Sequence, residues 1–111
     1  MKRRSQAPLF TDAWDLSAWL LTNLDGNPAS LPTSLCRLSL ALLDAVVLAL
    51  KDIDRDQQIA VADTTLIRLR MRIRLAVETG LLSDRQALFL LDKADSIGRQ
   101  LGGWIKSLDA A

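Results

Sequence analysis

The stretch from Leu66 to Val77 decides the fold, and it reads Leu-Ile-Arg-Leu-Arg-Met-Arg-Ile-Arg-Leu-Ala-Val. Four of the chain's fourteen basic side chains fall in it, namely Arg68, Arg70, Arg72 and Arg74. Apolar residues alternate with these arginines, which taken alone is the pattern of a half-buried strand with one arginine face. Whether this stretch is a strand or a helix therefore decides on which face or faces the four arginines lie.

The flanking sequence favours a long helix. From Asp56 to Thr79 there is no Gly or Pro to end an element, and Gly80 follows as a favourable left-handed C-terminal cap. This span is far longer than an ordinary strand. At about 100° per residue, one narrow face of the helix is apolar. That face carries Ile59, Ala62, Leu66, Leu69, Ile73 and Val77.

A helix divides the four arginines into two pairs. Arg70 and Arg74 lie on one flank, and Arg68 and Arg72 lie on the other. A second apolar stripe separates the pairs, and it consists of Ile67, Met71 and Leu75. Within each pair the i, i+4 spacing makes the like charges repel by a few tenths of a kcal/mol. Such a helix either exposes the pairs as a solvated charged face or gives them anionic partners, and the spacing leaves both readings open.

The composition is that of a single all-α domain. The chain has 111 residues, which is enough for a real core. Half of the residues are hydrophobic, Leu and Ala dominate, and there are only three Pro and five Gly to break helices. The formal net charge is +1, so any binding of a polyanion must come from local clusters of charge.

The residues that usually carry catalysis are missing. The chain has no His, which is the commonest general base and the commonest metal ligand. Cys36 is the only cysteine, which rules out a disulfide framework and indicates a packed thiol in a reducing compartment. No nucleophile with a base and no Gly-rich phosphate loop is present. We therefore expect no enzyme activity, no cofactor and no bound metal.

The sequence favours a cytoplasmic protein. The basic start Met1-Lys-Arg-Arg is followed by Ser5-Gln-Ala-Pro instead of the apolar region of a signal peptide. The most apolar run, residues 38–50, is too short for a membrane span and carries Asp44. We therefore expect no membrane association.

Four helices are expected after a basic arm. Residues 1–10 form the arm, and its three cations indicate a flexible tail or a contact with phosphate. Residues 11–108 form the bundle, with helices at about 11–24, 33–53, 57–79 and 84–108.

Local signals place three of the helix starts. Thr11 or Asp12 is expected to cap the first helix, and Ser30 the second. Ser83 followed by Gln86 matches a capping box at the start of the last helix.

The second helix is apolar on nearly every side from Leu38 to Leu50, which predicts self-association. The turn after it, residues 52–56, contains no Gly or Pro, so the end of this helix is hard to place. In the last helix, Gly98 and Gly102 are spaced i, i+4 and would let another helix approach closely.

Three segments together resemble one family of helical bundle proteins. Residues 31–37 resemble a Leu-Pro-x-Ser-x-x-Arg opening of its second helix. Residues 69–76 and 80–86 resemble its third helix and the turn that follows. Residues 95–106 resemble its closing Ile-Gly-x-x-Leu-Gly-Gly-Trp signature. The family includes the accessory variability determinant (Avd) of diversity-generating retroelements and the related proteins encoded in 23S ribosomal RNA intervening sequences.

The resemblance implies a fold, an assembly and a function. Members of this family are antiparallel up-down-up-down four-helix bundles that assemble as homopentameric barrels. Avd has no catalytic activity of its own. It binds the reverse transcriptase of the retroelement and nucleic acid, and it supports the mutagenic copying of template RNA into cDNA.

Six arginines become candidates for contact with such partners: Arg37, Arg68, Arg70, Arg72, Arg74 and Arg99. Arg70 and Arg74 match basic positions of the family's third helix. Arg37 and Arg99 fall on basic positions of the other matched motifs. The remaining two look like additions in this chain, either ordinary solvated residues or an extension of the same patch.

The chain departs from the family in its charge. Avd proteins tend to be strongly basic with a basic C-terminal tail, whereas this chain has a net charge of +1 and ends Lys-Ser-Leu-Asp-Ala-Ala. The resemblance therefore favours binding to a reverse transcriptase over strong, autonomous binding to RNA. Two alternatives stay open: a pentameric bundle protein of the intervening-sequence type, and a helical adaptor whose arginines meet acidic protein surfaces.

Overall fold

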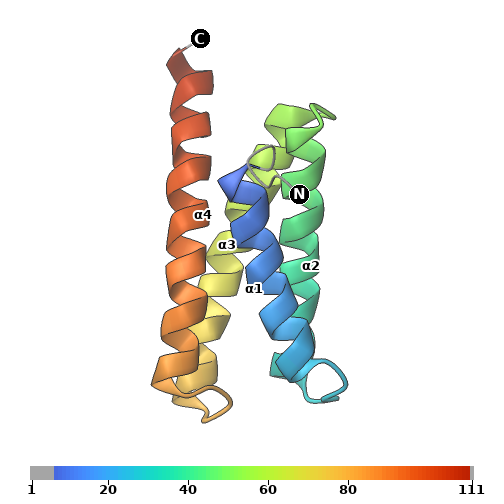
Figure 1. The fold of residues 1–111 in the computed structure, drawn as a ribbon, viewed down its shortest axis with the longest axis vertical. Coiled ribbons are helices and arrows are strands. Elements are labelled where there is room, and N and C mark those ends of the chain that lie inside the picture. The colour runs from blue at the N-terminus through green and yellow to red at the C-terminus, as the bar shows by residue number, and fades with distance from the viewer. Residues whose placement is uncertain (1–6, 111) are drawn as a thin grey trace, which may run out of the picture.

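The computed structural model describes residues 7–110, with the side chains of residues 7–107. Over this range the chain is all-helical and contains no strand. Its four helices are α1 (Pro8–Leu24), α2 (Ser30–Leu50), α3 (Arg55–Glu78) and α4 (Asp84–Ala110) (Figure 1). This confirms the predicted all-α fold with four helices. Residues 1–6, which make up most of the predicted basic arm, lie outside the described residues.

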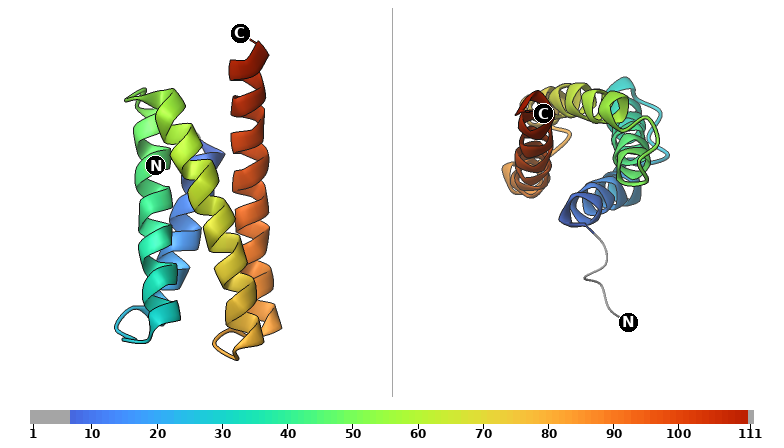
Figure 2. Two further views of the ribbon diagram at one scale, coloured as in Figure 1. Left: turned by 180° about the vertical axis from the view of Figure 1, so that it is seen from behind. Right: turned by 90° about the horizontal axis from the view of Figure 1, so that it is seen from above.

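The helices form an antiparallel up-down-up-down bundle. Each helix packs against its neighbours in the chain and α1 also packs against α4, whereas the backbones of the two diagonal pairs stay apart. Seen along its axis, the bundle is a ring of four helices (Figure 2). The α1–α2 and α3–α4 turns lie at one end, and the α2–α3 turn lies at the other, beyond which α4 extends (Figure 1).

Each helix turns one apolar stripe toward a common core. The largest side chains that are completely buried include Leu16, Leu20, Leu35, Leu42, Ile59, Leu69, Ile73, Leu90, Ile97 and Leu101. Full burial of one such side chain stabilises the fold by about 1.5–3 kcal/mol. On α3 the buried residues follow the narrow face predicted from the helical period, and Val77 at its end is partly buried.

The first two helices start differently from the prediction. α1 begins at Pro8, and its cap, Ala7, makes no side-chain hydrogen bond. Proline is favourable at this first helical position because its missing N–H has no partner in the helix. Thr11 and Asp12 therefore lie inside α1, and the prediction that either caps it was wrong. Ser30, the predicted cap of the second helix, is the first residue of α2.

A left-handed aspartate ends α2 at Leu50, earlier than the predicted residue 53. Asp52 has a φ of 60°, and its N–H donates to the carbonyl of Ala49 at 3.0 Å. The N–H of Ile53 donates to the carbonyl of Leu48 at 2.9 Å. These two bonds form a Schellman motif with Asp in the position usually held by Gly.

The α3–α4 turn follows the sequence prediction closely. Gly80 has a φ of 81°, and the N–H of Leu81 donates to the carbonyl of Ala76 at 2.8 Å. The predicted capping box is present, because the Ser83 N–H donates to Gln86 Oε1 at 2.9 Å and the Gln86 N–H donates to Ser83 Oγ at 3.1 Å. This turn therefore ends α3 and starts α4 within a few residues.

A polar seam closes α1 against α4. Asp12 Oδ2 accepts hydrogen bonds from Ser96 Oγ and, at 3.0 Å, from Gln100 Nε2. Lys93 Nζ lies 3.0 Å from Asp15 Oδ2 and 3.8 Å from Asp12 Oδ1. The carboxylate that was predicted to cap α1 therefore joins the first helix to the last.

Within the described part of the chain, α2 is long and apolar enough to cross a membrane by length and composition. The expectation that this run is too short considered residues 38–50 alone, whereas the helix has 21 residues and a mean hydropathy of 1.8. Core helices of soluble proteins pass the same test, so this is weak evidence. Among its large apolar side chains Leu40 and Leu50 are exposed, and the others are buried or half-buried.

Candidate partner-binding surface

The most continuous exposed apolar surface lies on α3. Ile67, Met71 and Leu75 are 62%, 57% and 48% exposed, and each lies about one turn after the previous one. They are the second apolar stripe that the helical period predicted, and they point away from the bundle core. Single exposed apolar side chains are ordinary, whereas a contiguous stripe with a polar rim marks an interaction surface.

Arginines border this stripe on both sides. Arg68 and Arg74 are exposed, and Arg70 and Arg72 are half-buried. Arg72 Nη1 donates to the carbonyl of Arg68 at 3.3 Å, so this side chain lies along its own helix. Among the side chains of residues 7–107, only Arg70 of these four takes part in an ion pair. The exposed guanidinium groups of Arg68 and Arg74 are therefore the most accessible to a partner, whereas that of Arg72 is engaged by a backbone carbonyl of its own helix.

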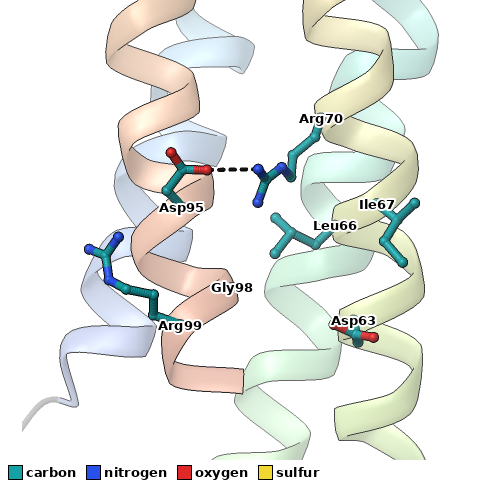
Figure 3. A pocket seen from close by; sticks show the side chains of 7 residues that line it. All are labelled: Asp63, Leu66, Ile67, Arg70, Asp95, Gly98 and Arg99. Atoms are coloured by element: carbon teal, nitrogen blue, oxygen red, sulfur yellow. Dashed lines mark ion pairs between the residues drawn. The ribbon is translucent and has the colours of Figure 1, made fainter. Parts of the chain in front are cut away.

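Arg70 is held by a carboxylate of the same chain. Its Nη2 lies 2.9 Å from Asp95 Oδ1 on α4 (Figure 3). The two side chains are 37% and 46% exposed, so solvent screens the pair and it stabilises the fold by no more than about 1 kcal/mol. Asp95 was not among the residues that the sequence analysis predicted to contribute to a site. Its role depends on the register of α4 against α3, which no local pattern reveals.

Arg70 and Arg99 share a groove between α3 and α4. The groove has a volume of about 500 Å³. It is lined by Asp63, Leu66, Ile67, Arg70, Asp95, Gly98 and Arg99 (Figure 3). Arg99 is exposed at its edge. Two candidates from separate sequence motifs therefore meet at one site, with a carboxylate from each helix beside them.

Gly98 lines this groove without a side chain. A Cβ atom at Gly98 would lie 3.5 Å from Leu66 Cδ2 and 3.6 Å from Arg70 Nη1, which is ordinary van der Waals contact. At Gly102 a Cβ would meet nothing within 4 Å. A Cβ would therefore fit at both positions, and within this chain neither glycine is needed to let another helix approach.

Arg37 lies apart from the other candidates. It is exposed on α2 and lines a second groove, of about 340 Å³, beside the α1–α2 turn. Cys36 lies in the same groove, where burial and, to a smaller extent, the charge of Asp25 raise the pKa of the thiol. A raised pKa keeps the thiol protonated and weakly nucleophilic. This second groove therefore brings the guanidinium of Arg37 and the carboxylate of Asp25 beside a buried thiol.

The side chains of this surface are of the kinds that bind partners. Among the described residues, no three His, Cys, Asp or Glu side chains are grouped so that they would hold a metal ion. The groups on offer are guanidinium ions, which pair with phosphates and carboxylates, and exposed apolar side chains, which pack against protein.

Comparison with known proteins adds no family assignment. No protein-family model, curated protein or solved structure matches this chain. The resemblance to Avd and to the intervening-sequence proteins therefore stays a prediction from three sequence motifs. The function is argued below from those motifs together with the α3 surface.

Proposed function

We propose that this protein is a non-catalytic accessory subunit of the Avd type, which acts in the cytoplasm. It binds the reverse transcriptase of a diversity-generating retroelement together with template RNA or cDNA, and it supports mutagenic reverse transcription. The observation that carries this proposal is the α3 surface, where four arginines border an exposed apolar stripe.

The two kinds of side chain suit two kinds of partner. Guanidinium groups bind phosphate by charge-assisted hydrogen bonds, often two at a time, and this contact does not depend on base sequence. Apolar side chains such as Ile67, Met71 and Leu75 gain free energy when a protein surface covers them. Nucleic acid suits the arginines, and a protein surface, either of the polymerase or of a neighbouring copy of this chain, suits the stripe.

The proposal includes a homopentameric barrel. One chain is nearly neutral, with a formal charge of +1. Five copies of the four α3 arginines would place twenty positive charges around one ring, so a locally basic surface arises from a nearly neutral chain. Phosphate contacts made by such a ring release counterions, and binding should therefore fall steeply as salt rises.

The test removes the two arginines that match the family. We expect Arg70→Ala combined with Arg74→Ala to abolish capture of the reverse transcriptase while the oligomer stays intact in light scattering. Arg55→Ala combined with Arg85→Ala is the matched control, because it removes the same charge from exposed arginines outside the stripe. Unchanged capture by the Arg70 and Arg74 variant would contradict the proposal.

The second candidate function is that of an oligomeric bundle protein or helical adaptor without a reverse-transcriptase partner. The Arg70–Asp95 pair favours it, because this arginine already accepts a carboxylate as its partner. Under this alternative the arginines bind acidic protein surfaces, and single-stranded RNA does not compete for them. The presence of a reverse-transcriptase gene and paired repeats beside the gene for this chain separates the two functions.

A further inference from the structure

A second exposed apolar surface lies on α1. Trp14 is 54% exposed, and its ring centroid lies 5.7 Å from that of Phe10. Ala18 and Leu21 continue this surface along the helix, the first exposed and the second half-buried. α1 and α3 are diagonal in the bundle, and their backbones stay apart (Figure 2). The molecule therefore presents apolar stripes on two opposite sides.

These two sides carry opposite charge. α1 and the residue that ends it contain three carboxylates and no basic residue, and among the side chains of residues 7–107 Lys93 of α4 is the one cation that pairs with them. Residues 64–77 of α3 contain four arginines and no acidic residue, and within the described part of the chain Asp95 of α4 is the one anion that pairs with them. After these pairings an acidic excess remains on the α1 side and a basic excess on the α3 side.

We propose that α1 of one copy docks on α3 of the next copy, with Trp14 packed against the stripe of Ile67, Met71 and Leu75. This inference rests on the self-assembly in the proposed function and assigns it an interface. Tryptophan and arginine are the residues that most often dominate interface energies. Arg68 and Arg72 border the stripe and take part in no ion pair among the side chains of residues 7–107, so either could stack on the Trp14 ring as a cation–π partner.

Charge favours docking of α1 on α3 over docking of two identical surfaces on each other. Two α3 surfaces facing each other would bring two sets of four arginines together, and two α1 surfaces would bring their carboxylates together. Like charges placed face to face cost several kcal/mol and suppress such pairings. Each copy therefore uses two different surfaces. Contacts of this heterologous kind close into a ring or continue as a filament, and a two-fold dimer does not satisfy them.

The interface leaves the α3–α4 groove open. Arg70 points toward α4, where Asp95 holds it, whereas Arg68 and Arg72 lie on the opposite flank of the stripe. A neighbouring α1 that covers the stripe and the Arg68 flank leaves Arg70 and Arg99 accessible in their groove. Assembly and binding to phosphate therefore use different arginines of the same helix.

A mixing experiment tests the heterologous interface. Trp14→Asp damages only the α1 surface, and Met71→Asp damages only the α3 surface. Each variant alone should be a monomer in analytical ultracentrifugation, whereas an equimolar mixture should form a one-to-one dimer from the one intact pair of surfaces. Leu88→Asp is the matched control, because Leu88 is an exposed apolar residue of α4 outside both surfaces, and this variant should assemble like the wild type.

Circular dichroism establishes that each variant keeps its helices, and Arg68→Glu combined with Arg72→Glu replaces Met71→Asp if that variant unfolds. A wild-type monomer, a mixture that stays monomeric, a single variant that still dimerises, or a disruptive Leu88→Asp change would each overturn this interface. A wild-type monomer that still captures the reverse transcriptase overturns the interface and leaves the proposed partner binding intact. A protein that assembles through this interface but captures no polymerase supports the interface and contradicts the proposed partner binding.

Discussion

Arg70 Nη2 lies 2.9 Å from Asp95 Oδ1, so an arginine that we propose as a partner contact is already paired inside its own chain. A partner phosphate must therefore compete with this carboxylate. Because both side chains are partly exposed, the pair is weak enough to be displaced, at a cost of no more than about 1 kcal/mol.

Removing the competing charge should tighten RNA binding. We expect Asp95→Asn to raise the affinity for single-stranded RNA about threefold, because it frees Arg70 and lowers the negative charge of the groove. Asp92→Asn makes the same change in net charge at an exposed position with no ion pair among the described side chains, and it should have a smaller effect. Fluorescence anisotropy with a labelled oligonucleotide measures both. Equal effects of the two variants would show that the ion pair does not limit Arg70.

In the polar seam between α1 and α4, Asp12 should contribute more to stability than a single surface ion pair does. Asp12→Ala leaves the donors of Ser96 and Gln100 without their shared acceptor, and we expect a loss of about 2 kcal/mol in the free energy of unfolding. Asp15→Ala removes only an ion pair with Lys93, and it should cost less than about 1 kcal/mol. Urea unfolding followed by circular dichroism gives both values. Equal losses of unfolding free energy in Asp12→Ala and Asp15→Ala would show that the hydrogen bonds of Asp12 add no stability beyond an exposed ion pair.

Two glycine substitutions should shift stability in opposite directions. Gly80→Ala places a Cβ on a residue with a φ of 81°, and we expect it to destabilise the fold by about 1–2 kcal/mol. Gly102→Ala lies inside α4 with nothing within 4 Å of the new Cβ, and it should stabilise the helix by up to about 1 kcal/mol. The same urea measurement checks the signs. A destabilising Gly102→Ala change would mean that another surface approaches α4 there.

The features that the sequence predicted are those encoded within one or two helical turns. The buried face of α3, the left-handed Gly80 and the Ser83–Gln86 capping box all follow from short spacings. The end of α2 was missed because Asp52 takes a left-handed conformation that is usually assigned to Gly. In each case local backbone chemistry decides the structure.

The features that the sequence did not predict depend on residues far apart in the chain. Asp12 looks like a helix cap by its local pattern, but its partners are Ser96 and Gln100 at the other end of the sequence. The candidate arginines were found by spacing and by resemblance, whereas the groove that joins Arg70 to Arg99 depends on how α4 lies against α3. Register between helices is a tertiary property, so neither the groove nor Asp95 was visible beforehand.

The salt dependence of RNA binding separates a phosphate-binding ring from a protein adaptor. For single strands, the slope of log K against log salt falls by about 0.7 for each phosphate contact. We therefore expect binding by the assembled protein to weaken steeply as salt rises, and Arg70→Ala combined with Arg74→Ala to flatten this slope. The Arg55→Ala and Arg85→Ala control removes equal charge outside the stripe and should leave the slope nearly unchanged. Anisotropy titrations at several salt concentrations measure it. If the slope is already flat in the wild type, the arginines contact no phosphate, and the adaptor function with acidic protein partners becomes the better explanation.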